Sequence, residues 1–191
     1  MNVQTKYPTT PDEFLRWNEG REGKREFVNG KVVEIMINVT RNHSDIAANV
    51  MALMRGQLDR KEFSVGTADF AVRTPAGIRF PDVFVDRKTH GGTGTDLEAV
   101  KPLVLVEVLS PSSLARDFHD KMADYQGVPS LLYYMIVAHD EPRVWLTARY
   151  KDGWSDTEQL IGFDEVVFLP EFNVTLSLRD IYDGVQLPSL Q

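Results

Sequence analysis

Residues 103–109 read Leu-Val-Leu-Val-Glu-Val-Leu, so six aliphatic side chains surround the single carboxylate of Glu107. A run without polar alternation is typical of a central strand that is covered on both faces. An ionised carboxylate loses its hydration in such a strand, which is costly unless a cation or hydrogen-bond donors pair with it. The run therefore predicts a core strand with a cation beside Glu107; without such a cation, the strand assignment would be wrong.

A second acid lies in a similar run upstream. Residues 78–85 read Ile-Arg-Phe-Pro-Asp-Val-Phe-Val, and a strand here places Asp82 on the same side as the phenylalanines two residues before and after it. For either acid alone, a bond to a backbone N–H or to a nearby arginine, Arg79 or Arg116, is an equally good explanation. Two carboxylates on neighbouring apolar strands, however, suit a hard cation such as Mg²⁺. Together, Asp82 and Glu107 favour a metal site.

The remaining pattern predicts helices early in the chain, a mixed sheet in the middle and one helix between two core strands. Thr10 followed by Pro11 is a helix start, and Asn29-Gly30 between two apolar runs is a strong hairpin signal. We expect an α/β (α+β) fold with a mixed sheet flanked by helices, as one domain over residues 1–191. The expected helices cover residues 11–19, a segment from Thr40 to Leu58, residues 114–126 and a turn near Asp180; the expected strands cover 25–28, 31–35, 63–73, 78–86, 103–109, 131–137 and 143–148, with short strands near Trp154 and Val166.

Composition narrows the functional classes. A chain of 191 residues with 42% hydrophobic and 26% charged residues is ordinary for one globular domain. The absence of cysteine excludes a thiolate metal site or nucleophile, and the absence of a signal peptide or a membrane-spanning stretch makes the cytoplasm the default location. The net charge of −7 counts against broad attraction to nucleic acid, although a local basic strip can coexist with an acidic body.

Lys121 is the expected third member of the site. On a helix that follows the Glu107 strand, Phe118, Lys121 and Tyr125 share one face, so the lysine lies between two aromatic rings. From the inward edge of that helix its amine could reach a metal-bound water or a phosphate oxygen, and Asp117, four residues earlier, could orient it. The alternative is a surface pair whose lysine snorkels to solvent, which is commoner for lysines in general.

Two further residues are accessory candidates. His43 begins the second helix on its apolar face, where a histidine is more often a core residue bonded to a backbone carbonyl than a ligand. Glu26 precedes the hairpin turn and is either a third acid of the site or a solvated strand residue. The sequence does not support three other kinds of site. Residues 91–94 do not form a phosphate-binding loop, Ser110 does not stand in a nucleophile elbow, and the four histidines are too scattered for a zinc motif.

These residues resemble a known family. The resemblance is specific from Glu107 to Lys121, weaker in the flanking motifs, and extends over nearly the whole chain. The family is the putative restriction endonuclease family, a bacterial branch of the PD-(D/E)XK nuclease superfamily. The matching segments are Pro81-Asp82, residues 107–112, Asp117 with Lys121 and Tyr125, Gly127-Val128, residues 26–31 with His43, residues 168–170 and residues 180–182.

The resemblance implies a restriction-endonuclease-like fold and roles for the candidate residues. Asp82 and Glu107 would bind Mg²⁺ or Mn²⁺ together with a backbone carbonyl next to Glu107. The superfamily's usual lysine lies two residues after the second acid, where this chain has Leu109. Lys121, on the following helix, would take its role, and Glu26 and His43 would be accessory.

The leading functional hypothesis is a Mg²⁺-dependent endonuclease that acts on DNA, with Asp82, Glu107 and Lys121 as its catalytic residues. The rival hypothesis is a nuclease-like fold that binds nucleic acid or protein without cutting, motivated by the acidic charge and by Leu109. A metal hydrolase of another phosphoester shares the same site. Because many nucleases of the superfamily pair to cut both strands, a homodimer is a further expectation that the sequence does not itself indicate.

Overall fold

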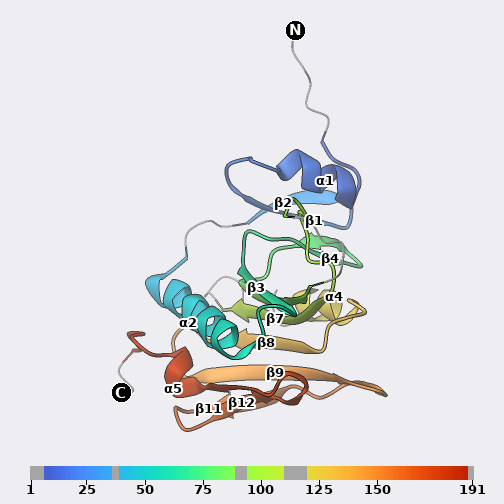
Figure 1. Cartoon of the computed structure of the whole chain (residues 1–191). Helices are drawn as coiled ribbons and strands as arrows, with labels where there is room; N and C mark the ends of the chain where they lie inside the picture. Colours follow the sequence, from blue (N-terminus) through green and yellow to red (C-terminus); the bar gives the residue numbers. More distant parts are fainter. Residues whose placement is uncertain (1–6, 36–38, 89–93, 110–119, 189–191) are drawn as a thin grey trace.

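The apolar run around Glu107 forms β7 (Pro102–Val108), and all seven of its residues are buried. β7 lies inside a seven-stranded sheet of order β10-β9-β8-β7-β6-β3, to which β11 adds by pairing with β9. Its neighbour β8 (Tyr133–Val137) is parallel, and its other neighbour β6 (Val83–Arg87) is antiparallel. The predicted mixed sheet is therefore confirmed (Figure 1).

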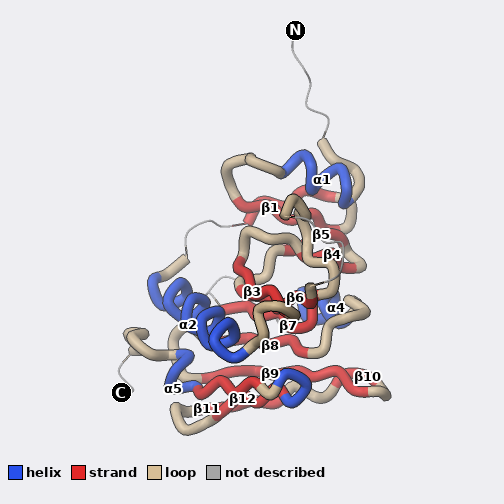
Figure 2. The backbone as a smooth tube through the Cα atoms, viewed as in Figure 1, coloured by secondary structure: helices blue, strands red, loops and turns tan. Residues whose placement is uncertain are grey.

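The computed structural model describes residues 7–35, 39–88, 94–109 and 120–188. Figure 2 shows how helices, strands and loops alternate along this part of the chain. Besides β6, β7 and β8, the elements are α1 (Pro11–Asn18), β1 (Lys24–Val28), β2 (Lys31–Ile35), α2 (Arg41–Gln57), β3 (Phe63–Thr67), β4 (Val72–Thr74), β5 (Gly77–Arg79), α4 (Met122–Gln126), β9 (Arg143–Tyr150), β10 (Gly153–Trp154), β11 (Glu158–Ile161), β12 (Val166–Leu169), a 3₁₀ turn (Pro170–Phe172), β13 (Val174–Ser177) and α5 (Leu178–Ile181).

Helices cover both faces of β7, which explains its lack of polar alternation. On one face, Ile46, Val50 and Met54 of α2 pack in a cluster with Val104 and Val106. The opposite face belongs to a second cluster, in which Leu105 and Leu109 join Tyr125 of α4 and Tyr134 of β8. Since β7 and β8 are parallel, the chain must cross from one end of the sheet to the other between them, and α4 lies on that crossover.

A smaller four-stranded sheet, of order β2-β1-β5-β4, carries the N-terminal part of the chain. Its β1–β2 hairpin turns at Asn29 and Gly30, whose φ angles of 49° and 77° fit a type I′ turn, as predicted from the Asn-Gly pair. α1 begins at the Thr10 cap and packs Phe14 against Phe27 of β1. Figure 1 shows α1 and this sheet gathered at the N-terminal end of the molecule.

Two predicted strands are each divided in the structure. The run predicted as one strand over 78–86 contains β5 of the small sheet and β6 of the central sheet, with Pro81 between them, because proline lacks the N–H that a continuous ladder needs. The run predicted over 63–73 is broken by a turn at residues 68–70, between β3 and β4.

The other differences concern the ends of elements and the last third of the chain. α4 is the described end of the helix predicted over 114–126, whose residues 114–119 lie outside the described part. β11 and β13 were not predicted, and β9 pairs with β8 in antiparallel register.

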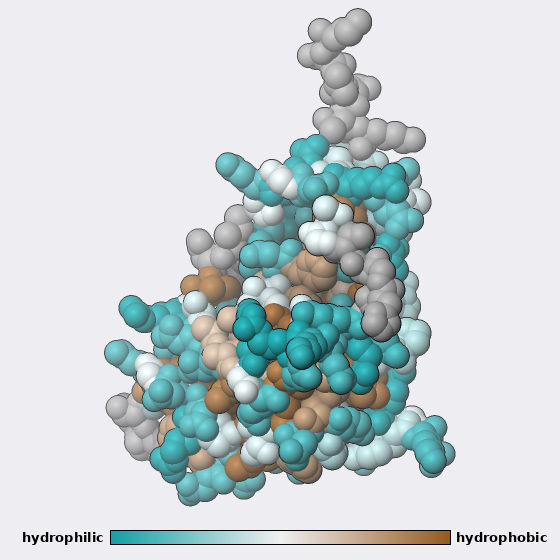
Figure 3. Space-filling view, in the orientation of Figure 1, coloured by the Kyte–Doolittle hydropathy of each residue, from teal (hydrophilic) through white to brown (hydrophobic). Residues whose placement is uncertain are grey.

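Hydrophilic residues predominate on the face seen in Figure 3. In the described ranges, no helix is both long and apolar enough to span a membrane.

Gly77 provides a test of how closely β5 approaches β1 within the small sheet. Its φ is +148°, and an added Cβ would lie 1.9 Å from the backbone oxygen of Phe27, which precedes its β1 partner Val28. We expect Gly77→Ala to destabilise the protein by about 2–4 kcal/mol, since both strain and a backbone clash must be relieved. The matched control is Gly56→Ala on α2, where nothing lies within 4 Å and a gain of about 0.5–1 kcal/mol is expected.

Urea denaturation of both variants measures the difference in the free energy of unfolding. Equal stability of the two variants would contradict the close approach of β5 to β1.

Candidate active site

Asp82 and Glu107 lie side by side at one end of the central sheet. Asp82 immediately precedes β6, Glu107 is the penultimate residue of β7, and the antiparallel register that pairs Val83 with Val106 sets the two acids opposite each other. The Oδ2 atom of Asp82 accepts a hydrogen bond of 2.8 Å from the backbone N–H of Val108. The strand pairing itself therefore brings the two acids together.

Glu107 is 3% exposed and has the cation that its apolar surroundings predict. Its Oε2 atom lies 2.8 Å from Nζ of Lys121, and its Oε1 atom accepts a 2.8 Å hydrogen bond from the hydroxyl of Tyr125. Lys121 and Tyr125 are four residues apart, so one helical face presents both groups to the strand. The alternative of a lysine that snorkels to solvent is wrong, because the Lys121 side chain is only 7% exposed.

His43 holds the second acid. Thr40 caps α2 by accepting a hydrogen bond from the backbone N–H of His43, and the imidazole Nε2 lies 3.1 Å from Oδ2 of Asp82. The expectation of a backbone carbonyl as partner is wrong, since the histidine bonds to a carboxylate. Burial opposes ionisation of Asp82, but the hydrogen bond and charge of His43, the Val108 N–H and the charge of Lys121 together lower its pKa below the ordinary 3.8.

This shift predicts how stability depends on pH. Because the folded-state pKa of Asp82 is lowered, its stabilisation is fully present above the unfolded-state value of 3.8 and is lost as pH falls through the folded-state value. We expect Asp82→Asn to lower the free energy of unfolding by about 1–3 kcal/mol at pH 7, because hydrogen bonds to a charged group are lost. Between pH 5 and pH 2 the variant should lose less stability than the wild type, as measured by urea denaturation at each pH.

The control for this pH series is Asp152→Asn, a substitution in the exposed turn between β9 and β10. A pH profile of Asp82→Asn parallel to that of the wild type would contradict the role of Asp82 in acid stability.

Glu26 is buried rather than solvated, with an exposed fraction of 1%. Its Oε2 atom accepts a 2.8 Å hydrogen bond from Nη1 of Arg79, while its Oε1 atom is buried and finds no hydrogen-bond partner within the described ranges. Nε of Arg79 also donates to Asp124 at 2.9 Å. Asp124 further accepts hydrogen bonds from the Thr74 hydroxyl and the backbone N–H of Ala76, so this network joins the small sheet to α4.

The buried charges act on one another. Burial, followed by the negative charges of Glu107 and Glu26, raises the pKa of Tyr125 well above its ordinary value of 10.0. The phenol therefore stays protonated and donates to Glu107 throughout the physiological range. Burial opposes the charge of Arg79, but the charge of Glu26 and hydrogen bonds to Asp124 and Glu26 outweigh it and raise the guanidinium pKa.

The structure thus brings together six of the seven residues predicted from the sequence. Asp117 lies outside the described residues. Arg79 was considered as a partner for Asp82 or Glu107, but it pairs instead with Glu26 and Asp124. Asp124 itself was not predicted, since a single acid on a short helix carries no pattern that marks it as buried. The six residues are Glu26, His43, Asp82, Glu107, Lys121 and Tyr125.

The oxygen donors at this site fit Mg²⁺ or Mn²⁺. Within the described residues there is no group of three or more histidines or acids that could hold a metal. Mg²⁺, however, is commonly held by one or two carboxylates while waters and substrate phosphates complete its octahedron. Both hydrogen bonds of Asp82 use Oδ2, so its Oδ1 atom has no hydrogen bond among the described residues and can face a cation.

Comparison with known proteins adds independent information. Residues 11–181 match the model of the Uma2 family, which is described as putative restriction endonuclease. Two uncharacterized proteins of Synechocystis sp., slr1290 and sll1609, are 29% identical over 146 residues and 26% identical over 140 residues. These alignments cover 75% and 72% of this chain and 76% and 78% of the relatives.

A solved structure has the same fold. The crystal structure of a putative nuclease belonging to DUF820 from Anabaena variabilis superposes with a TM-score of 0.72 at 18% sequence identity. The match covers 94% of this chain and all of that chain. The central sheet and its helices are therefore of the restriction-endonuclease-like type, as the family resemblance implied.

Proposed function

Because the chain belongs to the Uma2 family, described as putative restriction endonuclease, we propose that it is a metal-dependent endonuclease that hydrolyses the phosphodiester bonds of DNA. The observation that carries the proposal is the junction of Asp82, Glu107 and Lys121 at one strand end, with the lysine amine 2.8 Å from the Glu107 carboxylate. Two acids can hold a divalent cation that activates water for phosphodiester hydrolysis, and a lysine amine beside them can bind a phosphate oxygen.

Each residue has a defined task in this proposal. Asp82 and Glu107 would hold the metal, with His43 and the Val108 N–H fixing Asp82 and Tyr125 fixing Glu107. A bound Mg²⁺ or Mn²⁺ would lower the pKa of a coordinated water and stabilise the charge that develops on the phosphate. Lys121 donates a hydrogen bond to the attacking water or to a phosphate oxygen from its position beside Glu107.

The position of Leu109 supports the assignment of Lys121. Leu109, where the superfamily's lysine usually stands, is 4% exposed and packs in the apolar cluster with Leu105 and Tyr125. A lysine at that position would have to bury its charge among these side chains. The amine reaches Glu107 from the neighbouring helix instead, so the cation is supplied from a different element.

The test is cleavage of supercoiled plasmid in Mg²⁺ or Mn²⁺, with an excess of chelator as control, and calorimetric titration of each metal into the protein. Metal-dependent nicking that the chelator stops is the expected result. A bound metal without hydrolysis of any nucleic acid would favour the rival function, a nuclease fold that binds without cutting. Cleavage that survives chelation would remove the metal mechanism.

A further inference from the structure

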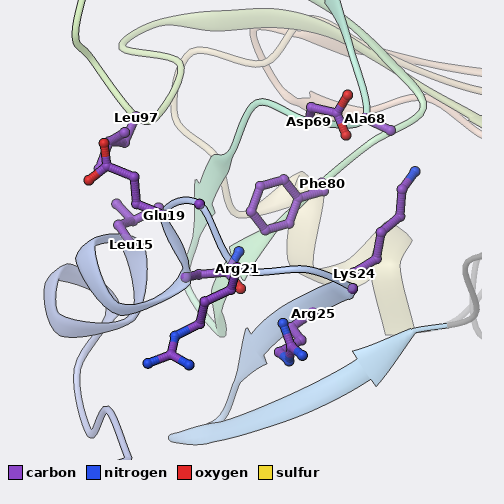
Figure 4. Close-up of a pocket in the computed structure, with 12 residues that line it drawn as sticks. Leu15, Glu19, Arg21, Lys24, Arg25, Ala68, Asp69, Phe80 and Leu97 are labelled. Carbon is purple, nitrogen blue, oxygen red and sulfur yellow. The ribbon is translucent and has the colours of Figure 1, made fainter. Parts of the chain in front are cut away.

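A pocket of about 330 Å³ lies at the end of α1 (Figure 4). Its walls come from the end of α1, the loop into β1, the turn after β3 and Phe80. Phe80 lies two residues before Asp82, and the pairing of Thr67 with Val83 carries Ala68 past the same end of the central sheet. The pocket therefore borders the strand end that holds the two acids.

The loop at the rim of this pocket carries three cations, while the acids Glu19 and Asp69 line other parts of the wall. Residues 20–25 read Gly-Arg-Glu-Gly-Lys-Arg, which places three cations together in a chain of net charge −7. Arg21 donates through Nε to the carbonyl of Trp17 and lies 4.3 Å over the Trp17 ring, so its position is fixed while its two terminal amino groups remain available. Lys24 makes no ion pair with any residue in the described ranges.

Arg25 is already engaged, because it donates to the carbonyl of Glu22 and lies 3.6 Å from Glu34. Arg21 and Lys24 are therefore the two cations that a negatively charged ligand would meet.

The interior of the pocket offers a ring face and an unsatisfied acceptor. Phe80 is half-buried and packs against the cluster of Phe14, Phe27 and Ile78 on one side while it lines the pocket on the other. Figure 4 shows its ring between the Arg21 loop and Asp69. Asn18 also lines the pocket, and its Oδ1 atom is buried with no hydrogen-bond partner among the described residues. A buried acceptor without a donor is unfavourable and points to a ligand that carries an N–H.

We propose that this pocket binds one unpaired nucleotide of the nucleic-acid substrate, beside the phosphodiester bond that is cut. The base stacks on Phe80 and donates an N–H to Oδ1 of Asn18, while Arg21 and Lys24 bind the adjoining phosphates. Aromatic faces combined with a basic rim are the usual means of holding single strands. This inference deepens the proposed endonuclease function and rests on it.

The phosphate contacts are tested by fluorescence anisotropy with a labelled 15-nucleotide oligothymidine and the full-length protein in excess chelator. Each contact with a single strand contributes a slope of about −0.7 in log K against log salt, so the Arg21→Ala/Lys24→Ala variant should flatten the slope by about 1.4 and bind about 25-fold more weakly at 0.1 M salt. The matched control is Arg55→Ala/Arg60→Ala, which removes two charges from another basic pocket, at the far end of α2.

The base contact is tested with Phe80→Leu, which keeps an apolar side chain against Phe14 and Phe27. Loss of base stacking should weaken oligothymidine binding roughly five- to 150-fold. The same variant should bind an abasic 15-mer as the wild type does, because that ligand has no base to stack. Thermal unfolding verifies that each variant is folded. If Phe80→Leu does not fold, the result for Arg21→Ala/Lys24→Ala alone tests the proposal.

Three outcomes would overturn the proposal. If the wild type cleaves plasmid but both pocket variants bind oligothymidine as tightly as it does, the pocket is not a nucleotide site although the nuclease function stands. If the Arg55→Ala/Arg60→Ala control weakens binding to the same extent, the effect is one of general charge. If the wild type neither binds nor cleaves nucleic acid, the proposed function fails together with this inference.

Discussion

Glu107→Gln is expected to reduce metal-dependent plasmid cleavage by at least about a thousandfold, since one of the two carboxylates that we propose as metal ligands loses its charge. The amide has the shape of the carboxylate and can still accept a hydrogen bond from Tyr125 through its oxygen. It carries no charge, however, and so neither holds a divalent cation well nor balances Lys121 at 2.8 Å. The loss should therefore appear in both activity and metal affinity.

Initial rates of plasmid nicking and calorimetric titration of Mn²⁺ measure these two effects. The matched control is Glu158→Gln, which removes an exposed acid on β11 and should leave both unchanged. If Glu107→Gln binds metal and cuts plasmid as the wild type does, Glu107 is a structural acid and the proposed mechanism is wrong.

Lys121→Met is expected to lower the rate of plasmid cleavage on the order of a hundred- to a thousandfold. Losses of this size are typical when one hydrogen-bond donor that stabilises a transition state is removed. It should also destabilise the protein by about 3–5 kcal/mol, because the buried Glu107 carboxylate would be left without its counter-charge. Methionine fills a similar volume, so the loss of stability reports the missing charge rather than a cavity.

A double-mutant cycle separates the two roles. In Glu107→Gln/Lys121→Met neither charge remains, so the double variant should be more stable than the sum of the single losses predicts, by roughly 1–3 kcal/mol of coupling. The rate of plasmid cleavage by the double variant should be no higher than that of the less active single variant. Recovery of cleavage together with stability would mean that Lys121 acts only as a counter-ion and that it has no part in the chemistry.

Local sequence predicted most of the central elements. The apolar run at 103–109, the Asn29-Gly30 turn and the helical pattern from Thr40 to Leu58 each correspond closely to what the structure shows, because each is specified by neighbours within a few residues. The division of 78–86 by Pro81 was not predicted, since both halves are apolar and only the pairing with different sheets reveals the break.

The site was predictable to the extent that buried charge requires a partner. Glu107 in an apolar run requires a cation on chemical grounds, and the helical spacing of Lys121 and Tyr125 places both of its partners on one helix face. The pairing of Glu26 with Arg79, and of Arg79 with Asp124, was not predicted. These residues lie 53 and 45 positions apart, and no local pattern connects them.

The sequence by itself determined the central strand, its buried acid and the need for a positive charge beside it, because hydration and hydrophobic periodicity act on residues that are close in the chain. Only the tertiary structure decided which cation that is, which histidine holds Asp82 and that Glu26 is buried. Those outcomes depend on how two sheets and two helices pack. Packing brings together groups that are far apart in the sequence, and their sequence separation does not predict their distance in space.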